Sequence, residues 1–195
     1  MEDKWADLFE RIDACRNCEL CKTRINTVPG MGNPEADIMF VGEAPGAEED
    51  YQGRPFVGAS GQLLDQMMNS IHLNRENTYI TNIIKCRPPR NRTPLPEEAQ
   101  VCMPYFREQV RLVRPKIIVA LGATAAKYLI DSNIAITKQR GIWVERKGLH
   151  MIATFHPSYL LRDQSQKRLA WADFKSIRDK MKELGISPER STDDE

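Results

Sequence analysis

The chain of 195 residues carries 28 basic and 27 acidic side chains, and 41% of its residues are hydrophobic. This balance is too apolar for a disordered chain and too polar for a membrane protein, and a formal net charge of +1 gives no global argument for a polyanionic partner. No apolar stretch approaches the roughly 20 residues that span a bilayer, and the first residues lack the apolar region of a signal peptide. We therefore expect a cytoplasmic monomer without membrane association, folded as one domain over 1–186 and followed by a disordered tail over 187–195.

Hydrophobic periodicity predicts alternating helices and strands. An amphipathic helix with Trp5, Leu8 and Ile12 on one face begins the chain. Further helices are predicted over 58–72, 97–113, 122–130 and 165–184, and strands over 37–42, 78–84, 116–121, 142–145 and 149–155. This order predicts an α/β fold, a three-layer α/β/α sandwich around a central, mostly parallel sheet of four to five strands.

Chemically distinctive segments accompany the predicted strands. The sequence GEAPG (42–46) leaves the first strand, Asn82 lies in the second, Gly122 follows the third, and HPS (156–158) follows the last. In an open parallel sheet, ligands bind outside the carboxyl ends of the strands. We therefore expect these distant segments to converge.

The charges are unevenly distributed. Residues 85–92, KCRPPRNR, contain four cations and no acid, whereas acids gather at 48–50 and 193–195. Two interpretations of the basic segment stay open: a solvated surface loop, or a strip that faces phosphates.

Five cysteines in a cytosolic chain favour a metal site over disulfides. Cys15, Cys18 and Cys21 are spaced by two residues, but a bacterial ferredoxin run would need a further cysteine where Ile25 stands. Two thiolates from this loop together with the later pair would give four ligands, for either zinc or a 4Fe–4S cluster. The later pair is Cys86 and Cys102.

Five segments occur in a characteristic order behind Cys15-x-x-Cys18: GEAPG, GRPFVGASGQLLD, YITNIIKCRPPRNR, RPKIIVALGATAA and TFHPSYLLR. With them the chain resembles the family 4 uracil-DNA glycosylases, the iron–sulfur class, over about residues 13–180. The resemblance implies a uracil-DNA glycosylase-like fold and a hydrolase that flips uracil out of DNA and cleaves its N-glycosidic bond. The abasic site that remains would initiate base excision repair, and uracil-containing DNA is the implied partner.

The resemblance also implies a uracil site. Phe56 is similar to the residue that stacks on the extruded base, and Asn82 to the one that reads its Watson–Crick edge, offering an acceptor to N3–H and a donor to O4. His156 resembles the catalytic histidine, whose N–H would donate to uracil O2 as negative charge accumulates. Taken singly, each of these residues also has a structural interpretation, as a core aromatic, a capping asparagine and a packed histidine.

Residues around GEAPG are assigned by the same resemblance. Related glycosylases of the first family carry Gln-Asp-Pro where this chain has Glu43-Ala44-Pro45. The aspartate that is catalytic in that family is therefore missing from this chain. Glu43 is the implied acidic residue, which would position water or stabilise an oxocarbenium-like sugar. Gly42 and Ala44 would border the uracil, and Glu49 would exclude the methyl group of thymine.

Contacts to DNA and a cofactor complete the implied machinery. An apolar side chain of Leu160 or Leu161 would wedge into the duplex, one of the two being core. The implied phosphate contacts are Lys85, Arg87, Arg90, Arg92, Arg162, Lys167 and Arg168. The implied 4Fe–4S ligands are Cys15, Cys18, Cys86 and Cys102, which leaves Cys21 as a spare thiol. A structural role is expected for the cluster, because hydrolysis of an N-glycosidic bond transfers no net electrons.

The sequence bears on three alternative functions. A relative that links covalently to the sugar carries a basic loop containing histidine, whereas residues 135–141 here contain none, which favours turnover. A zinc-bearing, non-catalytic nucleic-acid module would contain no iron and release no uracil. An electron-transfer protein is disfavoured because it would not need a base pocket.

Overall fold

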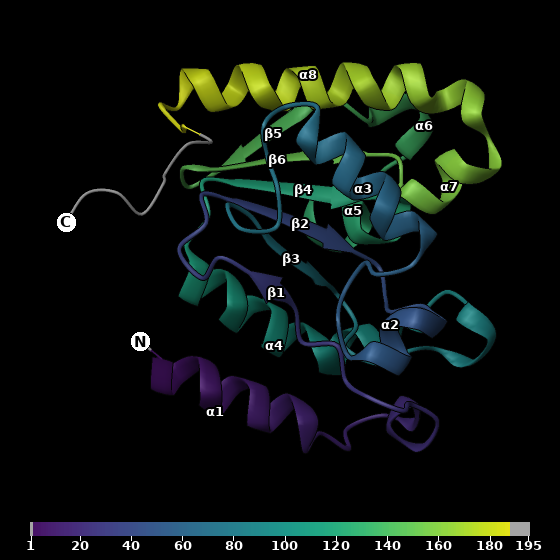
Figure 1. Ribbon diagram of the computed structural model, residues 1–195. Helices are drawn as coiled ribbons and strands as arrows, with labels where there is room; N and C mark the ends of the chain where they lie inside the picture. The colour runs from purple at the N-terminus through teal and green to yellow at the C-terminus, as the bar shows by residue number, and fades with distance from the viewer. Residues whose placement is uncertain (1, 188–195) are drawn as a thin grey trace.

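Six strands form one sheet in the order β1-β3-β2-β4-β6-β5 (Figure 1). The computed structural model describes residues 2–187, so the predicted tail, apart from Ser187, lies outside the described residues. The strands are β1 (Met31–Gly32), β2 (Ile38–Gly42), β3 (Tyr79–Asn82), β4 (Ile117–Leu121), β5 (Trp143–Arg146) and β6 (Leu149–Thr154).

The four central strands are parallel, and one antiparallel strand closes each edge. β2 and β4 are buried along their whole length. Their sequences, IMFVG and IIVAL, are continuous apolar runs, as expected for parallel strands that helices cover on both faces. The sheet has one strand more than predicted: β1, whose two residues are too few to give a periodic signal.

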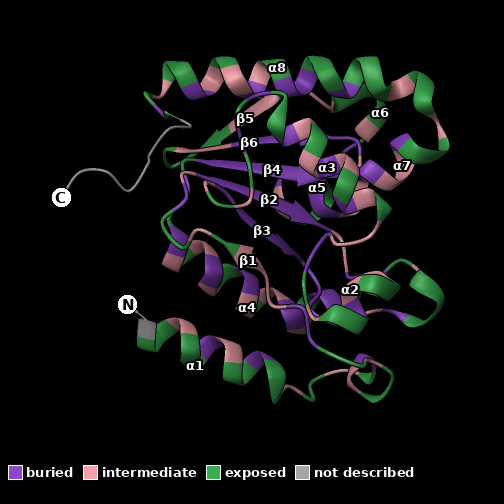
Figure 2. Ribbon diagram, in the orientation of Figure 1, coloured by how far each residue is buried: buried purple, intermediate pink, exposed green. Residues whose placement is uncertain are grey.

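Helices cover both faces of the sheet (Figures 1 and 2). On one face, α3 (Ala59–Asn69) and α8 (Lys167–Glu183) pack against alternate strand residues, and the rings of Phe40 and Phe174 stack with centroids 6.0 Å apart. The other face, with Met39 and Val41, packs against α4 (Pro96–Val113) and α5 (Ala123–Leu129). The predicted three-layer α/β fold is confirmed.

The N-terminal helix α1 (Glu2–Asp13) lies outside α4. Arg11 pairs with Glu108 of α4 at 2.6 Å, and the ring of Trp5 lies 5.2 Å from that of Tyr79. The remaining helices are short: α2 (Ala47–Gln52), α6 (Ile136–Gln139), α7 (Pro157–Arg162) and the 3-10 turns Glu19–Lys22, Pro89–Asn91 and Gln164–Gln166. Within residues 2–187, no helix combines the length and apolarity that a membrane span requires.

The register brings the predicted segments to one edge of the sheet. Gly42 at the end of β2 pairs with Asn82 at the end of β3, and Leu121 pairs with Thr154 at the ends of β4 and β6. The loops that follow these strands therefore leave the sheet side by side, so the expected convergence is confirmed.

Candidate active site

A cavity of about 240 Å³ opens at this edge of the sheet. The rings of Phe56 and His156 line it, together with Asn82, Glu49 and Ala44. Four of the residues predicted to contact uracil thus share one cavity, although they come from segments up to a hundred positions apart or more: Ala44, Phe56, Asn82 and His156. Glu43, the predicted catalytic acid, is half-buried next to the cavity but is absent from its lining.

Asn82 presents an unsatisfied acceptor. Its side chain is 2% exposed, and its Oδ1 atom has no hydrogen-bond partner among the described residues. Leaving a buried polar atom unpaired costs about 1–3 kcal/mol, and native proteins rarely tolerate it without a functional reason. The cavity beside Asn82 therefore suits a ligand that brings an N–H donor.

Gly42 allows this arrangement because it lacks a side chain. A Cβ atom at Gly42 would lie 2.3 Å from Asn82 Oδ1 and 2.6 Å from Cζ of Phe56. Both distances are far below van der Waals contact, so only glycine permits the amide and the ring to meet here. Gly42 does not line the cavity, so its contact with uracil stays a prediction, and its role in this structure is to leave space for its neighbours.

Phe56 is buried, and its ring centroid lies 5.7 Å from that of His156 at an interplanar angle of 30°. Its backbone is in the left-handed region, with φ of 53°. A bulky residue rarely adopts that conformation, which costs on the order of 1–3 kcal/mol. The surrounding structure must therefore hold the Phe56 backbone in place.

His156 is neutral and has a defined tautomer. Burial lowers the pKa of its ring to about 4, and the nearby charge of Arg162 acts in the same direction. The backbone N–H of Ser158 donates to Nδ1 at 3.1 Å, so in the neutral ring the proton is on Nε2. His156 can therefore donate a hydrogen bond from Nε2 without carrying a charge.

Glu49 joins the two loops that border the cavity. It is the third residue of α2, and its carboxylate accepts hydrogen bonds from the backbone N–H groups of Gly46 (3.1 Å), Val57 (2.9 Å) and Gly58 (3.0 Å). Three donors fix the carboxylate while it remains part of the cavity wall. The predicted place of Glu49 beside the uracil agrees with its position in the cavity wall, but its role in joining the loops depends on α2, which was not predicted.

Glu43 faces a different neighbour. The phenol of Tyr128 on α5 has its pKa raised by burial and, to a smaller extent, by the negative charge of Glu43. The main chain of Glu43 is fixed, because its carbonyl accepts a hydrogen bond from the N–H of Ile84 at 3.0 Å. Glu43 thus adjoins Ala44 of the cavity wall in the chain but does not itself line the cavity.

The structure identifies which of the two leucines is core, and one predicted phosphate contact is wrong. Leu160 is 1% exposed and packs with Phe155 and Ala170, so it belongs to the core, whereas Leu161 is 42% exposed. Lys85 is also buried: its ammonium donates to Thr81 Oγ1, the Asn82 carbonyl and Gln109 Oε1 at 2.6–2.7 Å, and burial lowers its pKa to about 7. A lysine enclosed in this way does not reach a phosphate.

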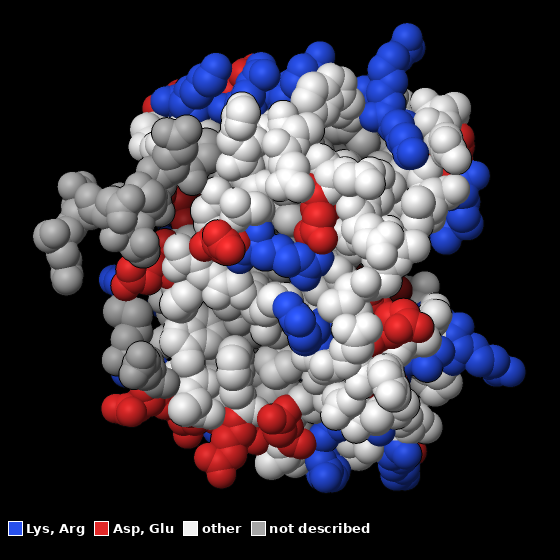
Figure 3. All heavy atoms as spheres, in the orientation of Figure 1, with Lys and Arg blue, Asp and Glu red and all other residues white. Residues whose placement is uncertain are grey.

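The remaining basic residues lie closer to the surface. Arg92 binds the buried carboxylate of Glu98 through both terminal nitrogens, at 2.9 and 2.6 Å, so its charge stabilises the start of α4. Its side chain is still 37% exposed, so its contact with DNA stays a prediction. Arg90 is exposed, as are Arg162, Lys167 and Arg168 near the start of α8. Figure 3 shows basic side chains over α8 and along the side of the molecule to which the parallel strands point.

The predicted cluster ligands converge on a second, narrow cavity of about 10 Å³. None of the five cysteines forms a disulfide, and burial raises the pKa of Cys18, of Cys86 and of Cys102, the last to about 11. Among residues 2–187, no three ligating side chains meet the geometry of a bound metal ion. The cavity is lined by Cys15, Cys18, Cys21, Cys86 and Cys102.

Two N–H donors point at the sulfur atoms of this cavity. The Arg24 guanidinium donates to Cys86 Sγ at 3.0 Å, and the backbone N–H of Lys85 donates to Cys102 Sγ at 3.3 Å. Donors of this kind stabilise thiolates and are common around iron–sulfur clusters. The thiol set and its donors therefore fit a thiolate-bound group.

Known proteins were compared with this chain. The model of the uracil DNA glycosylase superfamily matches residues 29–175. The chain is 43% identical to a type-4 uracil-DNA glycosylase from Sulfurisphaera tokodaii over 98% of this chain and 90% of the relative. Enzymes of the same name from Archaeoglobus fulgidus (45% identity; 88% of this chain and 90% of the relative) and Thermotoga maritima (44%; 90% and 94%) are similarly close. The chain therefore belongs to the uracil-DNA glycosylase superfamily and, within it, to the type-4 group.

Proposed function

We propose that this protein removes uracil from DNA by hydrolysing the N-glycosidic bond, leaving an abasic site for base excision repair. The observation that carries the proposal is the unpaired, buried Oδ1 of Asn82 in a cavity that is also lined by the rings of Phe56 and His156. An enzyme that acts on a base must take it out of the stack and hold it in such a pocket.

Asn82 would select uracil by the direction of its hydrogen bonds. The free Oδ1 accepts from uracil N3–H, and the amide N–H donates to O4. Cytosine presents the opposite pattern, with an acceptor at N3 and a donor at C4, so it would leave the buried oxygen unpaired. Phe56 supplies a stacking surface for the base.

His156 would act on the leaving group. As the bond between N1 and C1′ breaks, its electron pair stays with the uracil, and negative charge accumulates on O2. A neutral imidazole that donates from Nε2 stabilises this charge and keeps its own proton. Glu43 lies beside the cavity and would act on the sugar side, stabilising the cationic C1′ or orienting the water that attacks it.

Glu49 would make the pocket too small for thymine. Its carboxylate is fixed by three backbone donors, so it cannot swing aside for an added methyl group. The predicted DNA contacts that are exposed or half-buried would form a surface around this opening. They are Leu161 as the wedge, with Arg87, Arg90, Arg92, Arg162, Lys167 and Arg168 toward phosphates.

The thiols would hold a 4Fe–4S cluster through Cys15, Cys18, Cys86 and Cys102. The cluster would tie the N-terminal loop to the segment that follows Asn82, a structural function. Zinc is the alternative for the same thiols. Visible absorbance and iron content of protein purified without oxygen distinguish the two, because a zinc site is colourless.

The activity is tested with a uracil-containing oligonucleotide and the His156→Ala variant. We expect wild-type protein to release free uracil and to make the strand sensitive to alkali, and the variant to be slower by about 10²- to 10³-fold. A matched oligonucleotide with thymine in place of uracil is the control. Absence of uracil release by the wild type would refute the proposal.

A further inference from the structure

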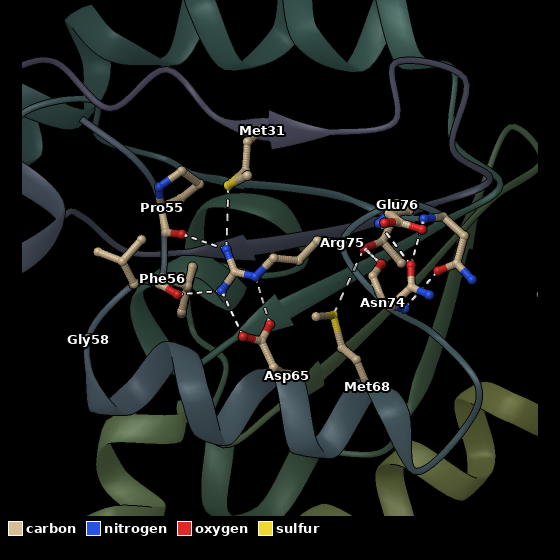
Figure 4. Close-up of polar contacts among 12 residues, drawn as sticks. Met31, Pro55, Phe56, Gly58, Asp65, Met68, Asn74, Arg75 and Glu76 are labelled. Atoms are coloured by element: carbon tan, nitrogen blue, oxygen red, sulfur yellow. Dashed lines mark hydrogen bonds and ion pairs between the residues drawn. The ribbon is translucent and has the colours of Figure 1, made fainter. Parts of the chain in front are cut away.

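Phe56 has a backbone that its side chain disfavours, and an arginine from another segment holds it. The carbonyl of Pro55 accepts from Nη1 of Arg75 at 3.0 Å, and the carbonyl of Phe56 itself accepts from Nη2 (Figure 4). Arg75 lies in the loop between α3 and β3, about twenty positions from the two carbonyls. One guanidinium thus binds both peptide units that precede and follow the strained φ of Phe56.

Asp65 of α3 fixes the other side of this guanidinium. Its carboxylate accepts from Nε of Arg75 at 2.8 Å and from Nη2 at 3.2 Å. Five N–H groups in one rigid plane allow arginine to bind a carboxylate and two carbonyls together, whereas a lysine ammonium offers a single point. The side chain of Arg75 is only 22% exposed, so solvent competes weakly for these contacts.

The supports of this contact are themselves ordered. Oδ1 of Asn74 accepts from the N–H groups of Glu76 and Asn77, which shapes the turn that carries Arg75 (Figure 4). On the opposite side, a Cβ atom at Gly61 would lie 1.7 Å from the Phe56 carbonyl oxygen, so α3 approaches that peptide as closely as glycine permits. The segment around Phe56 is therefore held from two directions.

We propose that Arg75, oriented by Asp65, is a positioning residue that sets the ring of Phe56 for stacking on the extruded base. The inference rests on the proposed function, because the ring needs its position only if a base stacks on it. Arg75 does not line the cavity, so it acts through Phe56 and not on the substrate.

The test uses Arg75→Met and Arg75→Lys, with Arg178→Met as the matched control. Arg178 pairs with a neighbouring acid on the surface of α8, away from the cavity. We expect Arg75→Met to lower kcat/KM for uracil excision by about tenfold to 100-fold and to weaken inhibition by free uracil by about tenfold. Arg75→Lys should not restore activity, since it keeps the charge but not the fork, and Arg178→Met should match the wild type.

A double-mutant cycle with Phe56→Ala distinguishes positioning from a general loss of structure. Without the ring there is nothing to position, so adding Arg75→Met to Phe56→Ala should change the single-turnover rate by less than about twofold. The inference would be overturned if the rate losses of the two single variants multiplied in the double variant, or if Arg75→Met kept full activity. Uracil release by the wild type would in either case leave the proposed function intact. If Arg75→Met does not fold, the cycle is run with Arg75→Lys. Absence of uracil release by the wild type would overturn both the proposed function and this inference.

Discussion

The side-chain oxygen of Asn82 is buried and has no hydrogen-bond partner among the described residues, which lowers the stability of the folded protein. A buried acceptor without a partner costs about 1–3 kcal/mol, and its replacement by an apolar group of similar shape removes that cost. We expect Asn82→Leu to raise the free energy of unfolding or leave it unchanged, while uracil excision falls by at least about 10²-fold. Denaturant unfolding and single-turnover kinetics on the same preparation measure the two effects. Retained excision would show that the amide does not read the base.

His156 gives a prediction about pH. Its pKa is about 4 in the folded protein and 6.5 in its ordinary state, so between these values the unfolded chain binds more protons than the native one. The contribution of His156 to stability is therefore complete above about pH 6.5 and is lost as the pH falls toward 4. We expect the free energy of unfolding to rise with pH across this window, and to rise less steeply in His156→Gln. Identical slopes for the two proteins would contradict a neutral, buried ring.

Sequence reasoning found the three residues whose side chains meet in the cavity, because Asn82, Phe56 and His156 lie in segments with a recognisable order. It did not find how they are held. The left-handed backbone of Phe56 and its contact with Arg75 are set by tertiary packing, and no local pattern signals them. The burial of Lys85 was missed for the same reason: within KCRPPRNR it cannot be told from the exposed cations.

At the scale of elements, the end of β4 is followed by a glycine, Gly122, that lies against His156. Gly122 has φ of 90°, and a Cβ atom there would lie 2.9 Å from Cβ of His156. Gly148, in the turn between β5 and β6, has φ of 80°, and a Cβ atom added there would have no other atom within 4 Å. The two glycines thus share a positive φ, which glycine adopts without strain, but differ in their neighbours.

We expect Gly122→Ala to lower uracil excision by at least about tenfold, because His156 must shift, and Gly148→Ala to lower stability only. Alanine at positive φ is strained at both positions, so thermal unfolding measures what they share. If Gly122→Ala and Gly148→Ala had equal activities and equal losses of stability, the contact between residue 122 and His156 would be unimportant for excision.

Adjacent leucines of α7 give a matched pair. Leu160 is enclosed, so Leu160→Ala should lower stability by about 2–5 kcal/mol. Leu161 is exposed, so Leu161→Ala should change stability by less than about 0.5 kcal/mol. The same substitution should slow excision from duplex DNA more than from single strands, because an extruded base leaves a gap to fill only in the duplex. Denaturant titrations and rates on both substrates test the pair. Equal rates for Leu161→Ala and wild type on duplex DNA would exclude it as a wedge.

The strong elements were predictable because their patterns are long. Every helix of seven or more residues and every strand of four or more was expected near its observed position. The missed α-helices and strand are α2, α6, α7 and β1, each of which has six residues or fewer and is too short to give a periodic signal. α2 matters most, since it carries Glu49, and its start at Gly46 depends on the carboxylate of Glu49 accepting from the chain.

Across the whole molecule, the cysteines connect parts that the sheet alone does not join. Cys15 and Cys18 follow α1, Cys86 follows β3, and Cys102 lies in α4. Arg24 spans the same region, since it donates to Cys86 Sγ and to the carbonyls of residues 13 and 15. A group bound by these thiols would therefore stabilise the N-terminal segment against the sheet, at the side where Asn82 is fixed.

Cys86→Ser and Cys21→Ser test this arrangement as a matched pair in the same cavity. A serine hydroxyl replaces a thiolate ligand poorly, and binding free energy at such a site is folding free energy. We expect Cys86→Ser to lose the visible absorbance and to unfold about 4 to 8 °C lower, which corresponds to about 2 kcal/mol for a chain of this size. Cleavage within residues 14–30 by a protease should become faster. Cys21→Ser should keep the wild-type colour and unfolding temperature, and loss of colour in this variant instead would identify Cys21 as a ligand.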